Sequence, residues 1–124
     1  MQNLISDFIH FISENANSLY IPLTIFIFMD YITGVCLAVK EKKVSSKIGF
    51  LGIMRKVLIY GVAVLGRVLD RFLLTANANV ESMVILFYLS NEGISILENL
   101  TKLDVPFPAK FKQIFKNISN NRQK

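Results

Sequence analysis

The stretch that decides the fold is residues 19–39, LYIPLTIFIFMDYITGVCLAV, in which Asp30 is the one charged side chain. An α-helix of about 20 apolar residues spans the ~30 Å hydrocarbon core of a bilayer. Two more apolar stretches follow at residues 57–74 and 80–97. Both contain charged side chains: Arg67, Asp70 and Arg71 in the first, Glu81 and Glu92 in the second. The sequence therefore predicts an all-α membrane protein with three transmembrane helices.

The charges inside these stretches need an explanation, because a charged side chain at the centre of a bilayer costs roughly 2.5–3.5 kcal/mol on insertion scales. A protein that served only as an anchor would not carry them. We expect the charges either to pair between helices, which implies a specific bundle, or to face water, which implies a pore.

Asp30 and Arg67 are the candidates for a pair. Each lies near the middle of its apolar stretch, with Asp30 11 residues and Arg67 10 residues from its start. Because consecutive spans run antiparallel, both should lie near the midplane of the bilayer. We hypothesise that these two side chains pair, within a subunit or between subunits, and hold the first two spans together.

The other charged residues leave two interpretations open. Arg67, Asp70 and Arg71 lie at i, i+3 and i+4 and share one helix face. That face either lines a pore or is neutralised locally, with Arg71 reaching the outer headgroups. Asn91 and Glu92 lie near the inner end of the third span, where Glu92 either faces a lumen or meets a basic residue of the inner loop.

The composition limits the class of protein. The chain has 124 residues, enough for one domain, and 52% of them are hydrophobic, more than a small soluble core can bury. We expect the domain to cover residues 1–118, with a disordered tail at 119–124. The single Cys36 cannot form an intramolecular disulfide, and the single His10 has no metal-ligand partners at a useful spacing. We expect no cofactor, no metal and no enzymatic activity.

Basic residues alternate along the chain as the positive-inside rule requires for three crossings. Residues 1–18 and 75–79 hold no Lys or Arg. Two other segments are rich in them: Lys40, Lys42, Lys43, Lys47, Arg55 and Lys56, and then Lys102, Lys110, Lys112, Lys116, Arg122 and Lys124. The pattern places the N-terminus outside and the C-terminus in the cytoplasm. Because these basic groups flank membrane spans, we expect the lipid bilayer, and not nucleic acid, as their partner.

Two amphipathic segments flank the spans. Residues 2–15 carry apolar side chains at helical spacing and predict an interfacial helix on the outer leaflet. The alternatives are a helix packed on the bundle or an irregular lead-in to the first span. Residues 107–118 form a basic amphipathic segment that contains Lys110, Lys112 and Lys116. This segment suits the anionic inner leaflet, and the alternative is a solvated tail.

Small residues recur along the first two helices and allow close helix packing: Gly34, Ala38, Gly49, Gly52, Gly61 and Gly66. The second helix should begin before its apolar part, with Ser45 or Ser46 as its N-cap. Pro106 and Pro108 should prevent the third helix from continuing.

Short motifs in a fixed order give the chain a family resemblance. They are Asp30-Tyr31-Ile32-Thr33-Gly34, Ser45-Ser46-Lys47-Ile48-Gly49, Gly52-Ile53-Met54-Arg55-Lys56 and Asn91-Glu92-Gly93-Ile94-Ser95-Ile96-Leu97-Glu98-Asn99. Over residues 26–115 the chain resembles the toxin-secretion/phage-lysis holins of Gram-positive bacteria and their phages. That family includes the holin-like protein encoded beside the large clostridial toxins.

The resemblance implies a function that composition does not show. Holins of this family accumulate in the bacterial cytoplasmic membrane, oligomerise and permeabilise it. An endolysin then reaches the cell wall, or a large toxin leaves the cell, without a need to bind the holin directly. The resemblance implies no catalytic residue. Its matched positions have structural or assembly roles: Asp30, Gly34, Ser46, Gly49, Gly52, Lys56, Asn91, Glu92 and Gly93.

Two other functions remain open from the sequence. A non-pore membrane adaptor would use the charges only to hold its bundle together, or its basic loop to recruit a partner. A small transporter would use Asp30 and Glu92 as proton-linked carboxylates, although three short spans without an internal repeat do not favour it unless the protein oligomerises.

Overall fold

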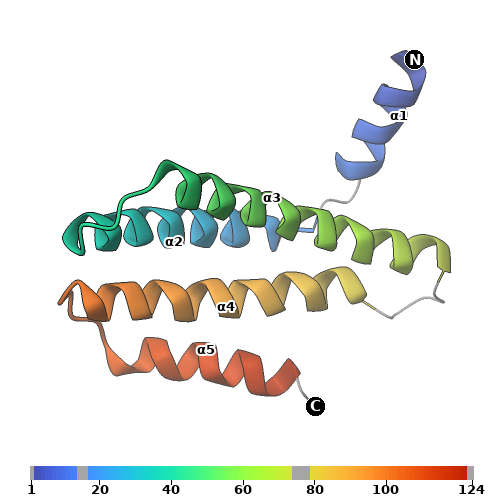
Figure 1. The fold of residues 1–124 in the computed structure, drawn as a ribbon. Helices are drawn as coiled ribbons and strands as arrows, with labels where there is room; N and C mark the ends of the chain where they lie inside the picture. The colour runs from blue at the N-terminus through green and yellow to red at the C-terminus, as the bar shows by residue number, and fades with distance from the viewer. Residues whose placement is uncertain (1, 14–16, 74–78, 123–124) are drawn as a thin grey trace.

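The structure is a computed structural model that describes residues 2–13, 17–73 and 79–122 (Figure 1). In chain order the elements are α1 (Gln2–Ser13), α2 (Tyr20–Lys40), α3 (Ser46–Val68), the π-helical turn η1 (Leu69–Leu73), α4 (Val80–Lys102) and α5 (Ala109–Arg122). Three segments are long and apolar enough to cross a membrane: α2, α3 together with η1, and α4. The predicted all-α architecture with three transmembrane helices is confirmed.

Helix α4 is the central element of the bundle. Helices α2 and α3 lie on one side of it and α5 lies on the other (Figure 1). The core lies where α2, α3 and α4 meet, and its buried side chains are Leu23, Ile27, Ile59, Ala63, Ile85 and Leu89. The outward faces of α2 and α3 stay exposed and apolar, as at Phe28 and Val57, which suits helices that contact lipid.

The second spanning helix begins at Ser46, eleven residues before the apolar stretch that starts at residue 57. Ser45 is its N-cap, because its side-chain oxygen accepts a hydrogen bond from the Ile48 N–H at 3.4 Å. The predicted early start is therefore confirmed. Helix α4 extends beyond its predicted end at residue 97 and stops at Lys102.

Helix α5 runs back alongside α4 and packs on it through an aromatic ring (Figure 1). The Phe115 ring lies over Gly93, with its nearest atom 2.6 Å from where a Cβ on that glycine would be. The same ring meets Phe26 of α2 edge-on, with 5.6 Å between the ring centroids. Absence of a side chain at Gly93 is what lets α5 approach the bundle this closely.

The two terminal helices differ from their predicted bounds. Helix α5 continues to Arg122, into the segment predicted as a disordered tail. Helix α1 projects away from the bundle and ends at Ser13, and its apolar side chains at Leu4 and Phe8 are exposed (Figure 1). The last part of the predicted N-terminal helix, residues 14–15, and most of the predicted turn at 75–79 lie outside the described residues.

Candidate functional site: a charged layer across the three spans

Three charged side chains, one from each spanning helix, meet inside the bundle. The Lys56 ammonium of α3 donates to Asp30 Oδ2 of α2 at 2.5 Å. It also donates to both carboxylate oxygens of Glu92 on α4, at 2.8 Å and 2.6 Å. Charge-assisted bonds of this kind are the strong class of hydrogen bond. We call these three residues the charged layer.

The charged layer lies at one height because its members have the same position in their helices. Asp30 is ten residues from the end of α2 at Lys40, and Glu92 is ten residues from the end of α4 at Lys102. Lys56 is ten residues from the start of α3 at Ser46. Ten residues of α-helix rise about 15 Å, half the ~30 Å thickness of the hydrocarbon core. The charges therefore meet near the middle of the spans.

Polar neighbours complete the layer. Asn99 of α4 donates through its side-chain amide to Asp30 Oδ1 at 3.3 Å and to the Thr33 hydroxyl oxygen at 3.0 Å. The exposed fractions of the side chains are 19% for Lys56, 11% for Asp30 and 7% for Glu92. The carboxylates of Asp30 and Glu92 share the ammonium of Lys56. When all three side chains are ionised, the charged layer holds one negative charge in excess.

The charged layer borders a large opening between α2 and α3. The cavity has a volume of about 1150 Å³, and its lining includes all three charged residues and Asn91. Helices α2 and α3 make few contacts with each other, since each packs mainly on α4. The charged layer is therefore open on the side between α2 and α3. In a closed bundle, helices would cover such an ion pair on all sides.

The predicted partner of Asp30 was wrong within the subunit. Lys56, and not Arg67, pairs with Asp30. Arg67 lies eleven residues further along α3, which places it about 16 Å away along the helix axis. The apolar stretch starts at residue 57, but the helix that contains it begins at Ser46, so Lys56 and not Arg67 lies at the height of Asp30. A pair between Asp30 and Arg67 of different subunits stays a prediction.

Lys56 was also expected at the membrane surface with the other basic residues, and this expectation is corrected. Because α3 begins at Ser46, Lys56 lies three turns inside the helix and reaches the two carboxylates. Within the subunit Glu92 therefore meets a basic side chain, and the alternative that it faces a lumen stays a prediction.

The other predicted surface cations remain outside the layer. Lys40 bonds Asp104 at 3.2 Å across the inner end of the bundle. Lys43 pairs with Glu41 at 3.7 Å. The remaining members are exposed: Lys42, Lys47, Arg55, Lys110, Lys112 and Lys116.

Asp70 has a structural role at the opposite end of the bundle. Its two carboxylate oxygens accept hydrogen bonds from the Val80 N–H at 2.8 Å and the Glu81 N–H at 2.9 Å. It therefore caps the N-terminus of α4 from another helix, where negative charge is favourable. Arg67 is buried at 5% exposure near this end. The Glu81 carboxylate accepts a hydrogen bond from the Tyr20 hydroxyl at 2.9 Å.

The predicted helix-packing residues divide into two groups. A Cβ on Gly66 would lie 3.1 Å from the backbone of Glu81, so this glycine permits the close approach of α3 and α4. Gly52 and Gly61 have nothing within 4 Å of the same position. Gly52 lines the opening between α2 and α3, together with Gly34, Ala38 and Gly49. For these four residues and for Gly61, helix packing stays a prediction for contacts between copies.

The arrangement is a cluster of charged side chains beside an opening. Within residues 2–13, 17–73 and 79–122, no group of three or more His, Cys, Asp or Glu side chains is placed to hold a metal ion. The charged layer can hold the three spans together, and its open side can admit water.

Comparison with known proteins identifies the family. The profile of the bacteriophage holin family matches residues 7–120. The chain belongs to this family. The resemblance drawn from the motifs is thereby confirmed for the family.

Relatives occur in bacteria and in a phage. An uncharacterized 14.9 kDa protein in the nagH 3' region of Clostridium perfringens is 44% identical over 102 residues, covering 82% of this chain and 77% of that protein. Protein YqxH of Bacillus subtilis is 35% identical over 95 residues, covering 77% and 67%. A probable holin of Bacillus phage phi105 is 37% identical over 81 residues, covering 65% and 59%. No solved structure matches this holin-family chain.

Two polar neighbours of the charged layer, Thr33 and Asn99, were not predicted as site residues. A signal for them exists in the sequence. Thr33 follows Asp30 by three residues, and Asn99 follows Glu92 by seven, so each shares a helix face with a charged residue. Polar residues that share a face with a charge on each of two helices indicate that these two faces meet in the bundle.

Proposed function

We propose that this protein is a pore-forming holin that assembles with copies of itself in the bacterial cytoplasmic membrane and permeabilises it. The observation that carries the proposal is the charged layer. Three ionisable side chains lie near the middle of the spans and border an opening of about 1150 Å³. Charge at this depth is rare and is typical of helices that face one another or a water-filled path.

The mechanism follows from the cost of charge in lipid. In a single subunit, Lys56 neutralises one of the two carboxylates that it contacts, and α4 covers one side of the layer. The open side of the charged layer still faces lipid in a single subunit. Because lipid has a low dielectric constant, the excess negative charge there is poorly solvated. Assembly of several copies with their openings toward a shared centre would surround the layer with water. Hydration of this face then favours the pore over dispersed subunits.

The orientation and the cargo belong to the same proposal. The distribution of basic residues supports an outside N-terminus and a cytoplasmic C-terminus. The cargo would be an endolysin, which leads to host lysis, or a large protein toxin. It would pass through the lesion without a dedicated binding site. The genes beside this one distinguish the two, because an endolysin gene indicates lysis and a toxin gene indicates export.

Release from liposomes tests the proposal. Full-length protein is reconstituted into liposomes loaded with a small dye and with a folded protein. We expect release to rise steeply with the protein-to-lipid ratio, because assembly precedes permeabilisation. Lys56→Gln should lower the ratio at which release begins, since its two carboxylates lose their ammonium and gain more from water. Lys47→Gln removes the same charge from an exposed position of the same helix and should leave that ratio unchanged.

A non-pore membrane adaptor is the second candidate, and the pairing inside the subunit favours it. Lys56 contacts both carboxylates without any partner chain, so the layer already holds three helices together. An adaptor would release neither dye nor folded protein at any ratio, and its expression would not arrest growth. That combination of results would overturn the proposal that the protein forms a pore.

A further inference from the structure

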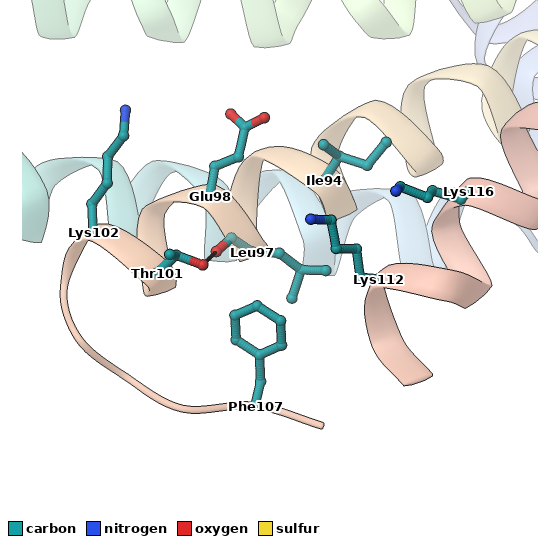
Figure 2. Close-up of a pocket in the computed structure, with 8 residues that line it drawn as sticks. All are labelled: Ile94, Leu97, Glu98, Thr101, Lys102, Phe107, Lys112 and Lys116. Atoms are coloured by element: carbon teal, nitrogen blue, oxygen red, sulfur yellow. Dashed lines mark hydrogen bonds between the residues drawn. The ribbon is translucent and has the colours of Figure 1, made fainter. Parts of the chain in front are cut away.

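A second cavity opens between the C-terminal half of α4 and helix α5 (Figure 2). Its volume is about 290 Å³. Apolar side chains form its floor, with Ile94 and Leu97 from α4 and Phe107 from the connector that precedes α5. The cavity is separate from the charged layer, with which it shares no lining residue.

Charged side chains surround this apolar floor. Figure 2 shows Lys112 and Lys116 reaching from α5 toward α4, while Lys102 and Glu98 project from α4 itself. In the part of the chain that the structure describes, none of these four side chains forms an ion pair within 4.0 Å. Three cations and one carboxylate give the rim a net charge of +2, which is uncompensated beside an apolar surface.

The cavity extends along about two turns of α4. Lys102 is the last residue of α4, and Ile94 is eight residues before it. Eight residues of helix rise about 12 Å, so the lining runs from the end of the span into its apolar interior. A ligand for this cavity needs an anionic group for the rim and a hydrocarbon part for the floor.

We propose that this cavity binds an anionic phospholipid of the inner leaflet. The phosphate would lie between Lys112 and Lys116, which Figure 2 shows at one end of the lining, and part of one acyl chain would cover Leu97 and Phe107. Lys102 lies at the other end of the lining and adds positive charge without touching the same phosphate. A free phosphate would leave the floor exposed, and a zwitterionic lipid would leave the net positive charge uncompensated. Basic pockets between helices on the cytoplasmic side are a known chemistry for anionic headgroups. The proposal rests on the cytoplasmic C-terminus and is independent of pore formation.

Lipid binding to the full-length protein in detergent tests the proposal, measured by native mass spectrometry. The probes are phosphatidylglycerol, phosphatidylcholine and glycerol phosphate, which carries the anionic group without acyl chains. We expect phosphatidylglycerol to bind most tightly and glycerol phosphate not to compete with it. The double variant K112Q/K116Q should bind phosphatidylglycerol roughly tenfold more weakly or worse, because each lysine near a headgroup contributes to affinity.

The controls separate this cavity from general attraction to positive charge. The double variant K42Q/K110Q removes the same charge from exposed positions outside the lining and should bind as the wild type does. K112R/K116R keeps the charge and should retain binding. Equal losses in both glutamine variants would overturn the proposal. Equal binding of phosphatidylcholine, or competition by glycerol phosphate, would also overturn it, the latter in favour of a site for free phosphate.

Discussion

At the scale of single residues, Lys56 joins two carboxylates that come from two other helices. Lys56→Gln should lower the free energy of unfolding by roughly 3–5 kcal/mol, because removal of one partner from a buried charge cluster leaves the others uncompensated. Unfolding of the protein in detergent micelles, followed by circular dichroism, measures the change. The matched control Lys47→Gln removes an exposed charge from the first turn of α3 and should have little effect.

The neutral triple variant D30N/K56Q/E92Q distinguishes the loss of a charge partner from the loss of packing. Without unpaired carboxylates, it should be more stable than Lys56→Gln alone. A triple variant as unstable as the single one would contradict the assignment of this effect to charge.

The sequence singled out all three members of the charged layer, but it placed Lys56 at the membrane surface and paired Asp30 with Arg67. Asp30 and Glu92 stand out because carboxylates are rare in apolar stretches. Lys56 is concealed, because it follows Arg55 at the edge of a basic segment and therefore resembles an interfacial residue. The helix start at Ser46, which the sequence also predicts, places it about three turns inside the helix.

At the scale of the elements, the close contact of α3 with α4 depends on Gly66. Gly66→Ala should lower the free energy of unfolding by about 1–3 kcal/mol, because the new methyl group would meet the Glu81 backbone at 3.1 Å. Gly61→Ala, in the same helix, places the same methyl group where nothing lies within 4 Å. It should be neutral or slightly stabilising. Equal thermal unfolding temperatures for the two variants would show that the α3–α4 contact is not tight at Gly66.

Hydropathy and length predicted the three spans, since a long apolar run has few alternatives to a membrane helix. The bounds were less predictable, because a helix continues through polar residues as long as its backbone bonds are satisfied. The position of α5 depends on Phe115 and Gly93, which lie far apart in sequence and share no periodic pattern. A basic amphipathic helix alone indicates a membrane surface, and the aromatic contact places it on α4.

At the scale of the whole molecule, the opening between α2 and α3 gives the bundle one incomplete face. The small residues along this opening and the exposed apolar surfaces of both helices suit contact with further copies. No pattern in a single sequence describes such a contact, because its partner surface is the same chain in another copy. We expect this face to become hydrated when the membrane is permeabilised.

Thiol accessibility tests that claim most directly. In a Cys36→Ser background, Asn91→Cys places a thiol in the lining of the opening, and Phe28→Cys places one on the exposed apolar face of α2. A water-soluble, membrane-impermeant thiol reagent is added before and after permeabilisation in cells. We predict that labelling at position 91 rises sharply on permeabilisation while labelling at position 28 stays low. Unchanged labelling at position 91 in a permeabilised membrane, or equal labelling at both positions, would contradict the account.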